Sequence, residues 1–285
     1  MSAPTVRRRR LGAKLRALRD GRGLTLGEAA EQSGGRITVA KLSRLETARS
    51  AAKAVDVEAL LDQYEVTDTE LRAAVLALTR EGARRGWWQS YRGVLSPVYE
   101  DLISLEAEAE ALYTWQLSVI PGLLQTAEYA REIIGATAMS ETVDAKVDAL
   151  VEVRLARQAV LTRENPLDLW AIIAESALST QCMGEGVMRD QLARLHLLSK
   201  RPNISIQVLP TDSPPHVGQL GSFSVLSFEG HRDLDVAHSE SLTSFVYFED
   251  QEQVSAYRDA ISRLRDAALP VEVSAERIAE KRDQV

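Results

Sequence analysis

The sequence has little of what several classes of protein require. It holds one cysteine among 285 residues, so no internal disulfide can form and a disulfide-stapled fold is excluded. No apolar run reaches ~18 residues, the length that a membrane helix needs, and no apolar stretch follows the basic N-terminal residues. Neither a membrane span nor a secretory signal is expected, and the sequence predicts a cytoplasmic protein.

Metal and catalytic signatures are also missing. The histidines and Cys182 show no zinc-ligand spacing, and Gly184 and Gly186 lack the third glycine and the preceding strand of a dinucleotide fingerprint. We expect Cys182 to pack in a core, and we expect no metal, no cofactor and no enzymatic activity. One alternative stays open, in which Glu175 and His216 form an acid–base pair if the fold brings them together.

What the sequence does hold is an uneven distribution of charge. Residues 1–53 carry thirteen Lys or Arg against four acidic residues, a local charge of +9, so the rest carries −16 of the total of −7. Apolar residues at 45% and charged residues at 26% are ordinary for a chain that buries a core, and 285 residues favour two domains. A basic head on an acidic body is typical of nucleic-acid-binding proteins, although a solvated basic tail gives the same count.

The basic head is predicted to form five short helices. In the first, over residues 11–19, leucines recur at helical spacing. The second opens at a capping box formed by Thr25 and Glu28, and Thr38 is the N-cap of the third. The predicted second, third and fourth helices cover residues 26–33, 39–46 and 55–64, and a capping box at 67–70 opens the fifth.

The third predicted helix has the features of a DNA-recognition helix. Leu42 and Leu45 face inward, which leaves Val39, Lys41 and Arg44 on the outside. In a helix-turn-helix the corresponding helix enters the major groove with its N-terminal residues on base edges. The ordered set of motifs resembles the DNA-binding domain of Xre-type, lambda-repressor-like regulators. The resemblance spans about residues 9–78 and rests on Arg16-Ala-Leu18-Arg19, Gly23-Leu24-Thr25, Ala30 and Lys41-Leu42-Ser43-Arg44-Leu45-Glu46.

The sequence departs from the Xre pattern in two ways. Twelve residues lead from Ala30 to Leu42 where the pattern has about ten, so the turn between the second and third helices is predicted to be longer by two. Val39 stands where a base-reading glutamine is frequent, and valine offers only apolar contact, for instance to a thymine methyl.

The predicted DNA contacts lie on the second and third helices and on the arginines before the first helix. We favour base reading for Lys41 and phosphate contact for Arg44, with phosphate contact as the alternative for both. Glu46 is predicted to be a structural ion-pair partner. The N-terminal arginines are predicted to form an arm that follows the DNA backbone or enters the minor groove, or else a disordered leader. The full set is Thr25, Arg36, Thr38, Val39, Ala40, Lys41, Ser43, Arg44 and Arg49, with Arg7, Arg8, Arg9 and Arg10 of the arm.

The acidic body is predicted to be an α+β domain, helical over 96–164 and sheet-containing over 165–285. Trp87 and Trp88, after a glycine-flanked junction at 81–86, are expected to pack at a domain boundary, with base stacking as the alternative. The predicted body helices cover 97–118, 127–134, 141–163, 187–199 and 254–268. The predicted strands cover 167–173, 204–209, 222–228 and 244–248.

The predicted fold class is therefore mainly α with a smaller β part. It combines a basic arm at 1–10, a five-helix lambda-repressor-like helix-turn-helix domain at 11–80 and the α+β domain at 81–285.

The body carries a second resemblance, which rests on Gly86-Trp87-Trp88, Val119-Ile120-Pro121-Gly122-Leu123-Leu124-Gln125-Thr126 and the segments 105–109, 175–178, 188–192 and 206–210. These are similar to the C-terminal domain of actinobacterial Xre-type regulators of the WhiJ-like, antitoxin-like kind. The resemblance implies a transcriptional regulator that binds double-stranded operator DNA and is associated with the nucleoid when bound. Its C-terminal domain would bind a small protein encoded nearby, form a homodimer, or both. The alternative is a small-molecule sensor or a cryptic enzyme activity in the body.

Overall fold

The computed structural model describes residues 5–79, 86–91, 93–137, 146–181, 184–228, 232–241 and 245–285. The chain divides into two compact units. Unit 1 comprises residues 1–86 together with two later segments, 228–236 and 249–251, and unit 2 comprises residues 87–227, 237–248 and 252–285. Cys182, His231 and most of the predicted junction at 81–86 lie outside the described residues.

Unit 1 is a bundle of five short helices completed by a turn from far along the chain. Its elements are α1 (Val6–Gly21), α2 (Leu26–Gln32), α3 (Val39–Glu46), α4 (Ala54–Gln63), α5 (Thr69–Ala77) and the 3-10 turn η6 (Arg232–Leu234). One apolar core joins all six. Leu15, Leu42, Leu60 and Val75 are fully buried in it, and Leu234 of η6 belongs to the same core with 5% of its surface exposed.

The predicted helices of the head are confirmed, and one predicted cap is corrected. The third helix has the predicted bounds, and the capping box of Thr25 and Glu28 is present at the start of α2. At α5 the predicted capping box of Thr67 and Glu70 is wrong. Asp68 is the N-cap instead, because its carboxylate accepts hydrogen bonds from the N–H groups of Glu70 at 2.9 Å and Leu71 at 3.1 Å.

Helix α1 begins at Val6, which corrects the prediction of a separate basic arm at residues 1–10. Val6 is buried, and the Thr5 side chain caps the helix by accepting a hydrogen bond from the N–H of Arg8. Residues 7–10 are therefore helical rather than an arm before the helix. Arginine has a high helix propensity, and the burial of Val6 makes it favourable to extend the helix toward the N-terminus.

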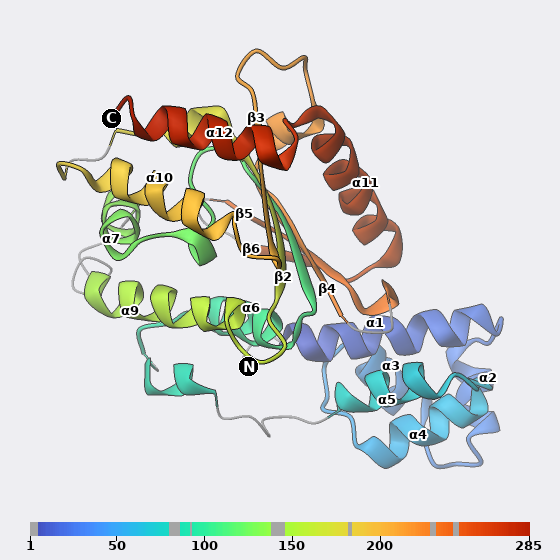
Figure 1. Ribbon diagram of the computed structural model, residues 1–285. Helices are drawn as coiled ribbons and strands as arrows, with labels where there is room; N and C mark the ends of the chain where they lie inside the picture. The colour runs from blue at the N-terminus through green and yellow to red at the C-terminus, as the bar shows by residue number, and fades with distance from the viewer. Residues whose placement is uncertain are drawn as a thin grey trace. The chain divides into compact units, whose positions relative to one another are not determined.

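Unit 2 is a six-stranded mixed sheet with helices on both of its faces (Figure 1). Its strands are β1 (Ala111–Gln116), β2 (Asp168–Ala174), β3 (Ile204–Leu209), β4 (Phe223–Ser227), β5 (Val236–Glu240) and β6 (Phe245–Phe248). Its helices are α6 (Pro97–Glu108), α7 (Ala127–Ala136), α9 (Val147–Arg157), α10 (Val187–Leu198), α11 (Gln251–Ala267) and α12 (Val271–Arg282). The 3-10 turns are η1 (Trp87–Tyr91), η2 (Gly122–Leu124), η3 (Gln158–Leu161), η4 (Glu175–Ser179) and η5 (Val217–Leu220).

The strands lie in the order β3-β2-β1-β4-β5-β6. The first three are parallel, with Leu112 of β1 opposite Leu169 of β2, and Leu169 opposite Ile204 of β3. Strand β4 runs antiparallel to β1, and β6 runs antiparallel to β5. Parallel strands need crossover connections, and the long helical segments between β1, β2 and β3 provide them.

Different helices cover the two faces of the sheet. Helix α11 covers one face, where its Val254 and Ile261 share a core with Trp115 and Ile172 of the strands. Helices α6, α7, α9 and α10 lie on the other side (Figure 1). The start of α12 contacts the outer edge of β3, where the N–H of Val208 donates a hydrogen bond to the Ser274 hydroxyl at 2.9 Å.

The sheet begins earlier in the chain than predicted, so the division into a helical part at 96–164 and a sheet part at 165–285 is wrong. The predicted helix at 97–118 ends at Glu108, and β1 follows. Within β1 the buried Leu112 and Thr114 alternate with the half-buried Ala111 and Tyr113, the period of a strand. The aromatic and β-branched residues at 113–115 favour that conformation.

The other predicted elements of the body agree with the structure in type. The predicted strands at 167–173, 204–209 and 222–228 are confirmed as β2, β3 and β4, and 244–248 as β6, with Ser244 outside the described residues. Of the predicted helix at 141–163, residues 146–163 are described and contain α9 and η3. Strand β5 and helix α12 are additional elements that the sequence did not predict.

The fold class is mainly α with a smaller β part, as predicted.

In η1, Trp88 packs against Leu95, Ile103 and Val153 of unit 2, whereas Trp87 is 41% exposed and meets Trp88 edge-on with 6.0 Å between ring centroids. No described helix combines the length and the apolar character that crossing a membrane requires.

Candidate nucleic-acid interface

Helix α3 of unit 1 has one buried face and one exposed face. Leu42 is fully buried and Leu45 is 3% exposed, which fixes the helix to the core. Outside the buried stripe Val39, in the first turn, is 49% exposed, and Ala40 and Arg44 are also exposed. Because these three side chains lie outside the core of unit 1, they are accessible to another molecule.

The turn between α2 and α3 contains the two additional residues predicted from the sequence, and a buried side chain anchors it. Gly34 and Gly35 have φ values of +62° and +82°, which residues with a side chain rarely adopt. Ile37 is 1% exposed and belongs to the core of unit 1. The Ser33 hydroxyl donates to the Ala30 carbonyl at 2.7 Å and accepts from the Ile37 N–H at 3.0 Å. The longer turn is therefore an ordered part of the motif.

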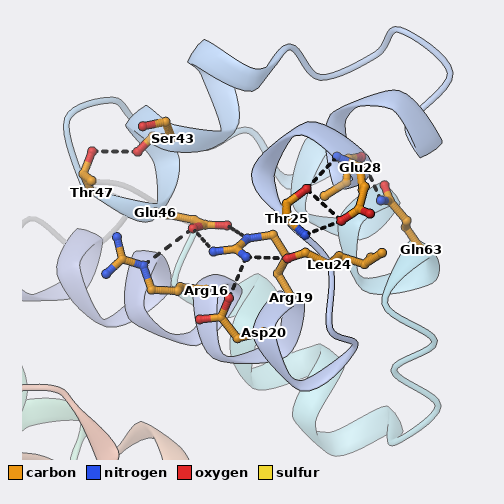
Figure 2. A network of polar contacts seen from close by, with 11 residues as sticks. Arg16, Arg19, Asp20, Leu24, Thr25, Glu28, Ser43, Glu46, Thr47 and Gln63 are labelled. Atoms are coloured by element: carbon orange, nitrogen blue, oxygen red, sulfur yellow. Dashed lines mark hydrogen bonds and ion pairs between the residues drawn. The ribbon is translucent and has the colours of Figure 1, made fainter.

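A buried ion pair joins the C-terminal end of α1 to the C-terminal end of α3 (Figure 2). The Arg19 guanidinium donates from Nε to Oε1 of Glu46 at 2.7 Å and from Nη2 to Oε2 at 2.9 Å. Its Nη1 donates to the Leu24 carbonyl and to Asp20, both at 2.6 Å. Hydrogen bonding to Glu46 raises the pKa of Arg19. Glu46 is thus a structural partner, as the sequence predicted.

The same region buries a tyrosine next to the ion pair. Burial raises the pKa of Tyr64 to about 12, and the negative charge of Glu46 adds to that rise. The Tyr64 hydroxyl has no hydrogen-bond partner within the described part of the chain. Removing either charge of the pair would therefore leave the remaining charge in a poorly solvated site.

Helices α1 and α3 also approach each other closely at a glycine. A Cβ atom at Gly12 would lie 2.6 Å from the carbonyl oxygen of Glu46 and 2.7 Å from that of Leu45. Both are backbone atoms of α3, so they cannot move without moving the helix. Gly12 and the Arg19–Glu46 pair together set where α3 lies on the bundle.

The first turn of α3 presents the residues predicted to meet DNA. Thr38 is its N-cap, and the Thr38 hydroxyl accepts a hydrogen bond from the Lys41 N–H at 3.2 Å. The Lys41 side chain is 35% exposed, and its Nζ atom lies 2.8 Å from Oδ2 of Asp56 in the first turn of α4. Asp56 therefore orients Lys41 and compensates part of its charge, which the sequence did not predict.

Most of the residues predicted to contact DNA lie on the surface of unit 1. The exposed ones are Thr25, Arg36, Thr38, Val39, Ala40, Arg44 and Arg49, and the half-buried ones are Lys41, Ser43, Arg7, Arg8 and Arg9. The predicted α3 residues surround the buried stripe of Leu42 and Leu45, and Thr25 is the N-cap of α2. Whether each of them contacts DNA stays a prediction.

Arg10 corrects the prediction that the N-terminal arginines contact DNA as a group. It is 4% exposed, and its Nε and Nη2 atoms donate to the Leu234 carbonyl at 3.0 and 2.7 Å. Its guanidinium lies 3.7 Å from the centre of the Phe228 ring. Arg9 is also engaged, by Glu249 at 2.7 Å. These cations are used inside unit 1 because the acidic and carbonyl groups of its two later segments lie against α1.

The later segments are the part of unit 1 that sequence reasoning missed. Asp233 pairs with Lys14 at 2.6 Å, and Leu234 enters the helical core. Burial raises the pKa of Glu249, which Arg9 counteracts. The segments 228–236 and 249–251 are short, and their apolar and acidic residues form no pattern that would link them to a helix bundle about two hundred residues earlier. Local sequence patterns therefore do not predict their contacts with α1.

Within the described ranges of the chain, no hydrogen bond or ion pair joins Glu175 to His216, the alternative catalytic pair. The Glu175 carboxylate accepts from Arg277 at 2.7 Å and from the Thr211 N–H at 3.1 Å. Hydrogen bonds from these two groups hold its pKa below the usual value, against the opposing effect of burial. The His216 ring instead meets Trp115 edge-on at 5.6 Å. Among the described residues, no three His, Cys, Asp or Glu side chains gather as metal ligands would.

Comparison with known families agrees with this division of the chain. Residues 10–74 match the family described as Helix-turn-helix domain, which indicates a sequence-specific DNA-binding regulator. Residues 99–280, more than half of the chain, match the family described as Domain of unknown function (DUF5753). No curated protein and no solved structure matches the chain. The chain therefore belongs to the DUF5753 family and carries an Xre-like helix-turn-helix DNA-binding domain at its N-terminus.

Proposed function

We propose that the protein binds an operator through the exposed face of α3, and that unit 2 assembles with a second copy of the chain or with a small protein encoded nearby. This is the arrangement of the WhiJ-like, antitoxin-like regulators that the sequence resembles. Unit 2 has no catalytic role in this proposal.

The exposed N-terminal half of α3 carries the proposal. Val39 is apolar and 49% exposed, and a thymine methyl group in the major groove would cover it. Ala40 and Thr38 beside it are small, which allows the helix to come close to base edges. Arg44, one turn after Ala40, is exposed and is proposed to contact the phosphate backbone.

Lys41 is the proposed base reader, because Asp56 orients its side chain at the start of the recognition helix. The test compares Lys41→Ala with the unchanged protein on an operator selected from random duplexes and on an unrelated duplex. Loss of one specific base contact weakens operator binding by about 1–3 kcal/mol and random binding by less. Arg22→Ala, which removes an arginine outside the predicted contact set, serves as the control. Equal losses on both duplexes would make Lys41 a phosphate contact.

A two-part operator requires two heads, so assembly is part of the proposal. Helix-turn-helix dimers place their recognition helices about one turn of DNA, ~34–36 Å, apart. We expect sedimentation of the full-length chain to show a dimer, and unit 2 to provide the interface. A strictly monomeric protein, both with and without operator, would contradict this assignment.

Binding of a small protein partner is tested with the full chain as bait. Leu234 lies in the core of unit 1, so a fragment that lacks residues 1–79 would expose it and bind other proteins through that surface. Co-expression with the protein encoded next to the gene should yield a complex that survives purification. Separate elution of the two proteins at micromolar concentration would leave dimerisation as the role of unit 2.

A further inference from the structure

Unit 2 contains a cavity of about 380 Å³ between η3 and the C-terminal half of α10. Three cationic side chains line it, Arg194, Lys200 and Arg201, together with three leucines, Leu161, Leu197 and Leu198. Small-molecule pockets in proteins begin at about 300 Å³. The cavity therefore has room for a small organic ligand.

Arg194 is held in place by a chain of hydrogen bonds. Its Nη2 donates to Oε1 of Gln158 at 2.5 Å. The amide nitrogen of Gln158 in turn donates to the carbonyls of Gly122 at 3.2 Å and Gln125 at 2.8 Å. Because both amide donors point toward those carbonyls, the Gln158 oxygen faces the guanidinium. The Nε atom of Arg194 is buried and has no hydrogen-bond partner among the described residues.

The positive charge of the cavity is not compensated within the described part of the chain, where no carboxylate forms an ion pair with Arg194, Lys200 or Arg201. Burial lowers the pKa of Arg194, and the positive charge of Arg201 lowers it further. Both effects cost free energy, and an anion between the two groups would remove that cost.

The end of helix α10 explains only part of this cluster. Lys200 and Arg201 follow the last residue of α10, where cations interact favourably with the helix dipole. Arg194 lies a full turn before that end, and its Nη2 donates to the Gln158 side chain instead of a helix carbonyl. Helix capping therefore accounts for Lys200 and Arg201 and leaves Arg194 unexplained.

The apolar part of the cavity is also open to solvent. Leu197 is 65% exposed, although the residues on either side of it on α10 are half-buried or buried. Leu161 and Leu198 behind it are 4% and 7% exposed. An exposed leucine beside unpaired cations suits a ligand with an apolar body and a charged group.

We propose that this cavity binds a small organic anion, with a phosphate or carboxylate group on Arg194 and Arg201 and a short apolar body against Leu197. The two guanidinium groups supply the planar, charged donors that such anions prefer, and Gln158 holds that of Arg194 in place. The site does not depend on the proposed DNA contacts, since every residue that lines it belongs to unit 2.

The test is calorimetric titration of the full-length protein at constant ionic strength with phenyl phosphate, benzoate, inorganic phosphate and benzyl alcohol. Saturable binding of phenyl phosphate or benzoate, tighter than that of inorganic phosphate and with no binding of benzyl alcohol, is expected. The first two probes distinguish a phosphate site from a carboxylate site. Equal binding of inorganic phosphate and the organic anions would overturn the apolar part of the proposal, and binding of none of the anions would overturn all of it.

The matched variants are Arg201→Gln, Arg194→Gln and the control Arg263→Gln. Arg201 and Arg263 are both exposed, so neither change disturbs the core, and each removes one positive charge from unit 2. Loss of a charged hydrogen bond should weaken the organic anion about tenfold in Arg201→Gln and Arg194→Gln and leave Arg263→Gln unchanged. Circular dichroism checks that Arg194→Gln is folded. Equal affinity of the Arg201 and Arg263 variants would place the anion elsewhere.

Discussion

The Nζ atom of Lys41 on the recognition helix α3 lies 2.8 Å from the Oδ2 atom of Asp56 in the first turn of α4. Only 15% of the Asp56 side chain is exposed, compared with 35% for Lys41. The acidic partner is therefore the more fixed of the two, and it determines where the cation lies. A base reader with a defined position loses less conformational entropy on binding than a freely rotating lysine.

Asp56→Asn is expected to bind random DNA more tightly and to discriminate the operator less well. The substitution removes a carboxylate that competes with phosphate for Lys41, and a pair of this exposure contributes about 0.2–1 kcal/mol, or up to about fivefold in affinity. Fluorescence anisotropy with both duplexes measures the two effects. The control Asp62→Asn removes another carboxylate of α4, which pairs with Arg72 and not with Lys41. It should leave the ratio of operator affinity to random-DNA affinity unchanged. Identical behaviour of the two variants would exclude a role for Asp56 in recognition.

Arg44→Ala is expected to weaken binding to operator and random DNA by the same factor. Arg44 is exposed in the last turn of α3, and a phosphate contact there carries no sequence information. The slope of log affinity against log salt should fall by about 0.9 when one phosphate contact is lost. A greater loss on the operator would show that Arg44 reads a base. This single substitution is a better test than deletion of residues 1–10, which would remove the buried Val6 and Arg10.

Gly12→Ala is expected to destabilise unit 1 and to displace the recognition helix. The added Cβ would meet the carbonyl oxygens of Glu46 and Leu45 at 2.6 and 2.7 Å, and such overpacking costs about 1–3 kcal/mol. The urea concentration at the midpoint of unfolding and the affinity for operator DNA should both fall.

Gly27→Ala is the control for that substitution. Gly27 lies in α2, and its added Cβ would have the Thr25 hydroxyl as nearest neighbour, at 3.8 Å. Alanine there should be neutral or should stabilise the protein by about 0.4–1 kcal/mol. If both alanine variants unfold at the same urea concentration as the unchanged protein, α1 and α3 are not packed as closely as described.

His238 of β5 is expected to make unit 2 less stable as the pH falls below about 6.5. Burial lowers the pKa of His238 to about 3, and the positive charge of Arg157 adds to this effect. The His238 side chain therefore stays neutral in the folded protein, whereas in the unfolded chain it takes up a proton near pH 6.5. The contribution of His238 to the free energy of unfolding is therefore complete above pH 6.5 and falls by about 1 kcal/mol per pH unit between pH 6.5 and 3. His238→Phe, which keeps the stacking on Phe245, should flatten this part of the pH profile. Parallel profiles for the two proteins would mean that His238 has the same pKa in the folded and unfolded states.

The head was predictable because its signals are local. Thr25 and Glu28 are three residues apart, and the leucines of α3 repeat at the helical period, so caps and faces follow from neighbouring residues. The sheet was less predictable. The apolar residues of β1 fit a helical stripe as well as a strand, and only the pairing with β2 and β4, far along the chain, decides between them.

In the candidate interface, too, the features set by neighbouring residues were predictable and those set by distant residues were not. Exposure of Val39 and Arg44 follows from helical spacing alone, and the structural role of Glu46 follows from its charge. The pairing of Lys41 with Asp56 depends on how α4 packs against α3, and the position of Arg10 depends on Leu234. Contacts between residues distant in sequence leave no trace in the local pattern.

Leu234 also has a consequence for the order in which the protein forms. A chain emerges from the ribosome N-terminus first, so all five helices of the head are complete long before this leucine has been translated. Until then the nascent bundle has a vacancy where Leu234 belongs, and Arg10 lacks its carbonyl acceptor. The bundle is therefore expected to reach its full stability only after Leu234 has been translated, and a chain that ends before this residue would carry a less stable DNA-binding domain.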